Sequence, residues 1–241
     1  MIGFVAGPPC ETWSRARGVP HGRAPPADGD GDAAPGLPVH GRGLPRILRA
    51  LSELWGLMSL GIRELCQILT GNSLLIFALE AIVEIALAGS VGLVEHPAEP
   101  DDLVDASSIW RLPVMDIILH LPCVEKIRFA QGLLGAKTAK PTELLCVNLP
   151  SMMQHLHANR VRKELPRGQS VGKDGQGHWR TSSLKEYAPA LCKAISEALR
   201  AAFDPQEVAA EHVCVPQHLL DICHSMQVQT FGSNFGPDYA R

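Results

Sequence analysis

Two residues with reactive side chains follow short apolar runs, and together they define a candidate active site. Cys10 comes after the run 2–6 and the turn 7–9 (Gly-Pro-Pro), and Glu95 comes after the run 91–94. A thiol on a turn stiffened by prolines has a fixed direction, which suits a nucleophile whose thiolate is the reactive form. The alternative is structural: Cys is often buried, and a carboxylate at a strand end is often solvated or caps a backbone group.

The elements that position both residues are strands alternating with helices. Apolar spacing predicts strands at 2–6, 91–94, 126–129 and 144–147 and helices at 44–69, 74–87, 107–121 and 184–203. Such alternation predicts an α/β fold with a mainly parallel sheet and flanking helices, whose ligands bind at the carboxyl ends of the strands. We therefore expect Cys10 and Glu95 on the same edge of one sheet.

Composition limits the classes of partner. The chain has 241 residues, with 22 Lys and Arg against 25 Asp and Glu, so a generally basic nucleic-acid coat is excluded. Any contact with DNA must come from a local patch; the run Arg160, Arg162, Lys163, Arg167 and Lys173 is either such a patch or a solvated surface. Seven cysteines without a C-x-x-C pair or a secretory leader indicate an intracellular, reduced protein, in the nucleus or the cytoplasm.

Two regions are expected to be poorly ordered. Residues 18–45 are rich in Gly, Pro and Asp and predict a mobile loop, and residues 204–241 predict a weakly ordered tail after a folded portion of residues 1–203. The tail holds a Cys/His-rich cluster at positions 212, 214, 218, 223 and 224. Its spacing matches no common zinc knuckle, so incidental Cys and His on a tail helix are preferred over a metal site.

The segment 73–94 is the best candidate for a membrane span. Glu80 and Glu84 interrupt it, and each would cost about 2.5–3.5 kcal/mol at the centre of a membrane helix. We therefore expect a buried helix followed by a strand, and no membrane partner.

Several motifs, in this order, resemble DNA (cytosine-5) methyltransferases. Residues 7–14 (Gly-Pro-Pro-Cys-Glu-Thr-Trp-Ser) resemble their catalytic loop, and residues 94–97 (Val-Glu-His-Pro) resemble their later E-N-V or E-N-P motif. Residues 131–148 and 184–189 are similar to stretches of divergent phage-like and mobile-element-like members. The resemblance covers residues 2–203 and implies a partial Rossmann-like methyltransferase fold.

The resemblance implies a mechanism and site residues. Cys10 would add to C6 of a flipped-out cytosine, Glu95 would hold ring N3 and the exocyclic amine, and C5 would take a methyl group from S-adenosylmethionine. DNA is the implied partner. Substrate-binding residues would be Pro9, Ser14, Arg15, Arg17 and Thr142, with Asn148 as a structural residue near the site.

The chain departs from the family at defined points. Glu11 stands where Gln is usual and His96 where Asn is usual, and there is no clear Q-x-R-x-R motif. The family's cofactor half normally precedes the catalytic loop, and no cofactor-binding residues are identified here. We therefore expect a fragment, a degenerate copy or half of a split enzyme that works with a missing upstream half. The alternative is a catalytically inactive methyltransferase-like module, derived from a mobile element, that binds DNA or a protein.

Overall fold

The computed structural model describes residues 3–13, 47–101, 106–167 and 186–203. The expected loop 18–45, the tail 204–241 and its Cys/His-rich cluster lie outside the described residues. The described elements are β1 (Gly3–Ala6), α1 (Ile62–Leu87), β2 (Val91–Pro97), η2 (Ile109–Arg111), α2 (Pro113–Leu119), β3 (Val124–Ala130), η3 (Gln131–Leu134), β4 (Pro141–Val147), α3 (Met152–Ala158) and α4 (Pro189–Ala202).

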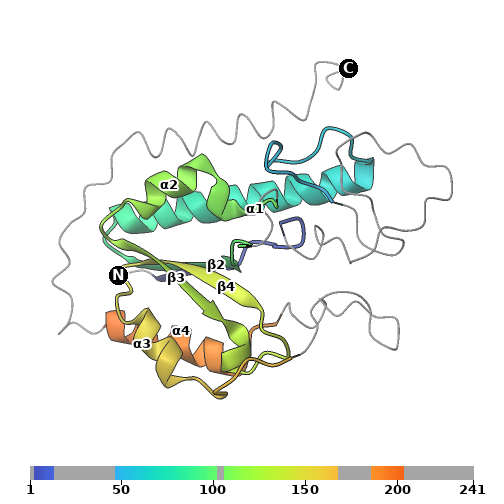
Figure 1. Ribbon diagram of the computed structural model, residues 1–241. Helices are drawn as coiled ribbons and strands as arrows, with labels where there is room; N and C mark the ends of the chain where they lie inside the picture. The colour runs from blue at the N-terminus through green and yellow to red at the C-terminus, as the bar shows by residue number, and fades with distance from the viewer. Residues whose placement is uncertain (1–2, 14–46, 102–105, 168–185, 204–241) are drawn as a thin grey trace.

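The strands form one sheet in the order β1-β2-β4-β3 (Figure 1). β1 pairs with β2 in parallel, with Ala6 opposite Val94. β4 is antiparallel to both of its neighbours, β2 and β3. The fold is therefore mixed α/β, and the two strands that lead to Cys10 and Glu95 end at the same edge of the sheet.

The prediction of a mainly parallel sheet was wrong, and the connection from β3 to β4 explains why. Parallel neighbours need a crossover of a dozen or more residues, usually a helix, whereas antiparallel neighbours need only a short loop. Residues 131–140 are too short for such a crossover and contain only the 3₁₀ turn η3 (Gln131–Leu134). β4 therefore folds back beside β3, and it pairs with β2 on its other side.

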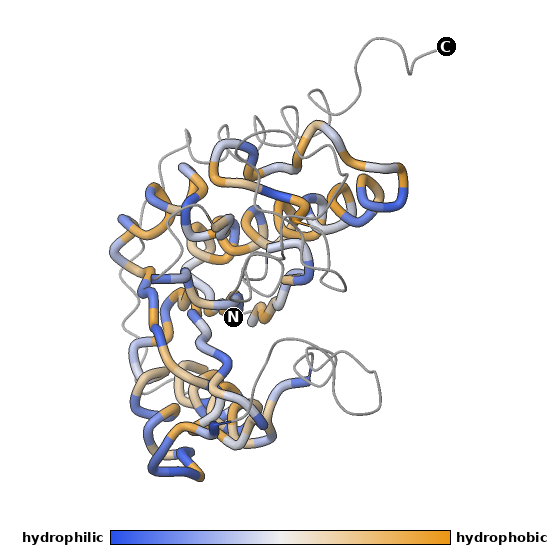
Figure 2. Tube along the Cα trace, turned by 45° about the vertical axis from the view of Figure 1, so that its right-hand side comes forward, coloured by the Kyte–Doolittle hydropathy of each residue, from blue (hydrophilic) through white to orange (hydrophobic). Residues whose placement is uncertain are grey.

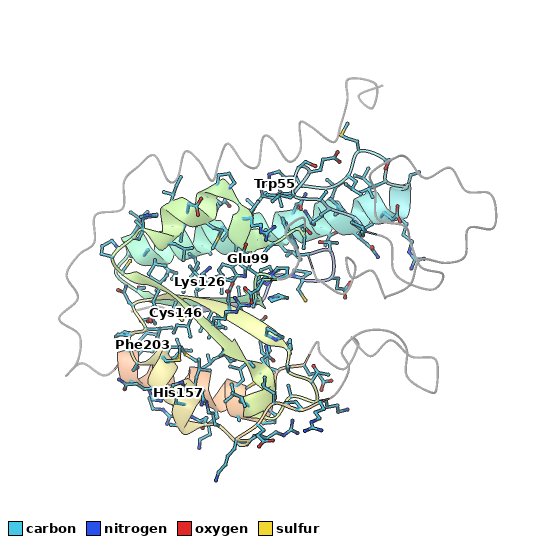
Figure 3. All side chains as sticks on the ribbon, in the orientation of Figure 1. Trp55, Glu99, Lys126, Cys146, His157 and Phe203 are labelled. Atoms are coloured by element: carbon cyan, nitrogen blue, oxygen red, sulfur yellow. The ribbon has the colours of Figure 1, made fainter. Side chains whose placement is uncertain are left out.

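Helices cover both faces of the sheet (Figure 1). α1 and α2 lie over one face, and α3 and α4 lie over the other. Val94 and Val147 belong to the core under α1 and α2, whereas their neighbours Leu93 and Cys146 belong to the core against α3 and α4. Figure 3 labels Cys146 on the α3 and α4 side. This alternation explains why β2 and β4 have nearly continuous apolar sequences, as expected for strands buried on both faces.

The first expected helix, 44–69, is not formed as predicted. Residues 47–61 have turns and an isolated β-bridge between Ala50 and Glu53 instead, and Gly56 has a backbone φ of 127° that a helix excludes. α1 begins at Ile62 and continues through 70–73, where the sequence predicted a break. Asn72 is buried there and donates a side-chain hydrogen bond to the carbonyl of Trp55 over 2.9 Å.

Gly71 has a packing role rather than a helix-ending one. A Cβ at this position would lie 3.2 Å from Thr12 Oγ1 and 3.5 Å from the guanidinium of Arg49. The glycine therefore lets the turn that follows Cys10 approach α1 closely, although glycine inside a helix costs about 1 kcal/mol relative to alanine. Gly71 and Asn72, which predict a helix end in the sequence, therefore make tertiary contacts in the middle of α1.

α1 is long and apolar enough to cross a membrane by length and composition alone. One side of it packs on the sheet, where Leu75, Leu79 and Ile82 are fully buried. Core helices share this length and composition, so the helix is weak evidence for a membrane span. The sequence predicted a buried helix followed by a strand: the strand β2 does follow, but the helix is buried on one side only, and Leu74 and Phe77 are exposed.

Candidate functional site

Cys10 lies on a turn at the carboxyl end of β1. The strand ends at Ala6, Pro8 is buried and Pro9 is exposed. The backbone N–H of Trp13 donates to the carbonyl of Cys10 over 3.0 Å and closes the turn. The thiol is half-buried.

The turn is fixed to the rest of the fold by Arg49. Its guanidinium donates two hydrogen bonds to Thr12 Oγ1, over 3.1 and 2.9 Å, and one to the carbonyl of Leu54 over 2.6 Å. The same group lies 3.8 Å above the ring of Trp13, a cation–π contact. Trp13 is buried and meets the ring of Trp55 edge-on. These contacts set the direction in which the turn presents Cys10.

Glu95 lies within β2, two residues before its end, and is only 7% exposed. Gln131 Nε2 donates to its Oε1 over 2.9 Å, and the hydroxyl of Tyr187 donates to its Oε2 over 3.0 Å. Lys140 Nζ lies 4.0 Å from Oε1. Two hydrogen-bond donors thus fix the plane of a nearly buried carboxylate, and an ammonium group lies nearby.

Thr142 contacts Gln131 and, in the part of the chain that the structure describes, makes no hydrogen bond with Glu95. Gln131 Nε2 also donates to Thr142 Oγ1 over 3.0 Å, and the Thr142 hydroxyl donates to the carbonyl of Lys140 over 3.0 Å. Thr142 is fully buried, so it orients Gln131 and Lys140 rather than facing an open cleft. Lys140 has a positive φ of 40°, a conformation rare outside glycine that its neighbours hold in place.

The charges of the site are coupled. Burial raises the pKa of Cys10, the negative charge of Glu95 raises it further, and Lys140 opposes both. Burial likewise raises the pKa of Glu95, against Lys140 and the hydrogen bonds from Tyr187 and Gln131. The pKa of Tyr187 is raised by burial and by the charge of Glu95 beside it. The sulfur and the carboxylate therefore belong to one electrostatic site, although they are 85 residues apart in the chain.

His96 points to the opposite face of the sheet from Glu95, because successive side chains of a strand alternate. Its ring is buried and meets Trp13 edge-on, with 6.5 Å between ring centroids. Burial, together with the charge of Arg49, lowers the pKa of His96 to about 3. The residue that replaces the usual Asn of the resembling motif is therefore a neutral core side chain under the Cys10 turn.

The structure brings only some of the predicted site residues together. Cys10 and Glu95 follow or lie on two adjacent parallel strands and are electrostatically coupled. Pro9 lines a groove between the Cys10 turn and the first half of α1, and the residues that line this groove include neither Cys10 nor Glu95. Asn148 is at the other end of the sheet, where its side chain donates to the carbonyl of Ser90 over 2.8 Å; its predicted place near the site was wrong. Ser14, Arg15 and Arg17 lie outside the described residues.

Three site residues were not selected from the sequence: Gln131, Lys140 and Tyr187. Each lies in a segment that carries the resemblance, and each is a polar residue next to a strand or helix end. Only the pairing of β4 with β2 and the approach of the segment before α4 place them at Glu95. Their local sequence signal is therefore weak.

The chain matches no family model, no curated protein and no solved structure. The resemblance to DNA (cytosine-5) methyltransferases is carried by the motifs alone.

The described residues do not fit S-adenosylmethionine. Such a cofactor needs a glycine-rich turn that leads from a strand into a helix N-terminus, where backbone N–H groups bind it. β1 leads instead into Pro8 and Pro9, which have no N–H, and among the described strands none is followed by such a turn. Likewise, the described residues contain no group of three or more His, Cys, Asp or Glu that could hold a metal ion.

Proposed function

We propose that this chain activates cytosine as part of a DNA (cytosine-5) methyltransferase-like protein. The observation that carries the proposal is the pairing of Cys10 with Glu95: two adjacent parallel strands bring a half-buried thiol and a fixed carboxylate into one electrostatic site. A thiol nucleophile beside an acid is the arrangement that attack on an unactivated pyrimidine ring requires.

Glu95 suits the edge of a cytosine that carries N3 and the exocyclic amine. N3 accepts a hydrogen bond and the amine donates one. A protonated carboxyl donates with one oxygen and accepts with the other, so it matches both groups at once. The raised pKa of Glu95 favours this protonated form, and Gln131 and Tyr187 fix the carboxyl plane.

Cys10 then supplies the bond that makes C5 reactive. As the S–C6 bond forms, the electrons of the C5–C6 double bond move into the ring, and N3 takes the proton of Glu95. Loss of that proton back to Glu95 returns the electrons to C5, which attacks an electrophile. Removal of the C5 proton to a base then breaks the S–C6 bond, and the thiolate leaves.

Because the charge of Glu95 raises the pKa of Cys10, the thiolate forms more readily once Glu95 carries a proton. The resting thiol is held protonated by burial and by the charge of Glu95. A proton on Glu95 removes that repulsion, and Lys140 then stabilises the single negative charge that remains on sulfur. In the proposed step the thiol proton passes to Glu95, so that a neutral thiol and a carboxylate become a thiolate and a neutral acid; the two groups titrate as a pair.

DNA as partner, S-adenosylmethionine as methyl donor and an upstream half that holds the donor are proposed from the resemblance. The target base would leave the duplex to reach Cys10, because C6 is inaccessible inside the stack. An intracellular location, and no membrane partner, belong to the same proposal.

The test is covalent trapping on DNA that contains 5-fluorocytosine. The full-length natural protein is supplied with S-adenosylmethionine, and a denaturation-resistant adduct is expected, because fluorine cannot leave C5 as a proton does. Cys10→Ser should abolish the adduct, and Cys192→Ser, which removes an exposed thiol on α4, should leave it intact. No adduct with the unmodified protein contradicts the proposal.

One observation favours the second candidate, a catalytically inactive DNA- or protein-binding module. The raised pKa of Cys10 means that the resting site holds a thiol rather than a thiolate. An inactive module would bind DNA equally well with and without Cys10, and would form no adduct. The trapping experiment therefore separates the two candidates.

A further inference from the structure

A loop packed on the connection between β3 and β4 carries an unusual density of positive charge. Residues 160–167, named here the basic loop, contain Arg160, Arg162, Lys163 and Arg167 and only one acid, Glu164. Residues 160–165 and Arg167 are exposed, whereas Pro166 is half-buried. Lys137, which lies in the segment that this loop packs against, is also exposed. In a chain of net charge −3, this is a local reversal of sign.

The basic loop is fixed to the connection between β3 and β4, residues 131–140. The carbonyl of Leu133 accepts hydrogen bonds from the backbone N–H groups of Val161 and Arg162, over 3.0 and 3.1 Å. Arg162 Nη1 donates to the carbonyl of Ala136 over 2.7 Å. A Cβ on Gly132 would lie 2.6 Å from Pro166, so the two segments are packed as closely as a glycine allows.

The same connection holds Glu95. Gln131 begins it and Lys140 ends it, and both reach the Glu95 carboxylate. The basic loop therefore has a set position relative to the Cys10–Glu95 site. In Figure 1 it is the lowest part of the described chain, and in Figure 2 it is coloured mainly hydrophilic.

The basic side chains of the loop differ from the other basic side chains of the fold in whether they form ion pairs. On the sheet side, Arg111, Lys126 and Arg128 pair with Glu99, Glu143 and Asp101. Arg160, Lys163, Arg167 and Lys137 make no ion pair with any residue in the described parts of the chain. Within the described residues, therefore, no acidic side chain occupies these positive charges.

We infer that the basic loop, with Lys137, contacts backbone phosphates of the DNA strand whose base enters the Cys10–Glu95 site. The inference rests on the proposed function and adds the surface that aligns the substrate. Phosphate contacts position a nucleic acid without reading its sequence, so binding through this loop is independent of base sequence and falls steeply with salt.

The test measures binding of the full chain to a labelled DNA duplex by fluorescence anisotropy between 50 and about 300 mM salt. Arg160→Gln and Arg167→Gln should each reduce the slope of log affinity against log salt by about 0.9, so that binding is about eightfold weaker near 0.1 M salt than it would be without the loss of one phosphate contact. Arg200→Gln is the matched control: Arg200 is exposed on the last turn of α4. That turn ends at Phe203, labelled in Figure 3, whose ring packs on Gly3 at the far end of the sheet.

The outcomes distinguish the loop from the function. The inference is overturned if Arg160→Gln and Arg167→Gln show the same salt slope as Arg200→Gln. It is also overturned if the protein binds polyglutamate as tightly as DNA, or if it does not bind DNA at all. Loop-dependent DNA binding by a protein that forms no adduct in the trapping experiment supports the loop and contradicts the enzyme. A covalent adduct together with unchanged salt slopes supports the enzyme and contradicts the role of the basic loop.

Discussion

Gln131 reaches across the sheet to Glu95: its Nε2 lies 2.9 Å from Glu95 Oε1, although the two residues are 36 positions apart. Gln131 follows β3, Glu95 lies on β2, and the intervening strand β4 contributes Thr142 to the same Nε2. One side chain thus connects three strands and orients the carboxylate that the proposed chemistry uses.

Replacing Gln131 with Leu should destabilise the protein by about 1–3 kcal/mol, because a nearly buried carboxylate loses a hydrogen-bond donor. The cost should fall in a Glu95→Gln background, where no buried charge needs that donor. Urea unfolding of the four proteins of this double-mutant cycle gives both values. Equal costs in the two backgrounds would show that Gln131 acts independently of Glu95.

Gly7→Ala should disturb the site through Tyr187. A Cβ on Gly7 would lie 2.3 Å from the Tyr187 hydroxyl oxygen but 3.5 Å from the ring carbon that bears it. The variant should therefore lose about 1–3 kcal/mol of stability by overpacking, and Tyr187→Phe, which removes the clashing oxygen, should restore part of that loss in the double variant. Thermal or urea unfolding measures the rescue; a purely additive double variant contradicts this geometry.

Alkylation of Cys10 should report its coupling to Glu95 and Lys140. Burial and the charge of Glu95 raise the pKa of the Cys10 thiol, so its reaction with iodoacetamide should accelerate only at alkaline pH. Glu95→Gln should shift the rate profile to lower pH, and Lys140→Gln should shift it to higher pH. Mass spectrometry of the peptide that contains Cys10 follows the rate, with the exposed Cys66 as an internal reference. A profile that neither variant moves would place the thiol outside the electrostatic site.

His96 should make the fold sensitive to acid. Its pKa is lowered to about 3 in the folded protein, so below about pH 6.5 the unfolded chain binds a proton that the folded chain does not. The stability that neutral His96 contributes is complete above pH 6.5 and is lost as the pH falls toward 3. Between pH 7.5 and 5.0 the loss from this residue should be about 2 kcal/mol.

The comparison variant is His96→Phe, which keeps a ring against Trp13 and cannot titrate. The difference in unfolding free energy between this variant and the unmodified protein should change by the same amount over that pH range. Glu95 and Glu143, whose pKa values are raised by burial, act with the opposite sign and cancel in the difference. A difference that stays constant with pH would mean that His96 titrates in the folded protein as it does in the unfolded chain.

The sequence predicts the strands and the sheet edge well, because both rest on short-range patterns. All four expected strands are present, although β2 extends to Pro97 and β4 begins at Pro141. The apolar runs of β1 and β2 also place Cys10 and Glu95 correctly on one edge, since two strands joined through a helix pair in parallel.

The parts that the sequence does not predict depend on tertiary contacts. Gly71 and Asn72 are typical of a helix end, but both lie inside α1. Gly71 lets the turn after Cys10 approach the helix closely, and Asn72 donates a hydrogen bond to the carbonyl of Trp55. The short helix α3, with its buried Met152 and Leu156, has too few residues for a clear period. Gln131 and Tyr187 become site residues only through strand order and the docking of α4, which no local pattern encodes.

Exchange of the cytosine C5 hydrogen with deuterated solvent tests the pairing of Cys10 and Glu95 most directly, and it needs no methyl donor. Addition of the thiolate to C6 lets C5 take a deuteron, and loss of the original proton followed by departure of Cys10 leaves a labelled base. We predict labelling of cytosine in DNA by the unmodified protein, and no labelling by Cys10→Ser or by Glu95→Gln. Absence of exchange with the unmodified protein, or exchange that survives both substitutions, would contradict the account.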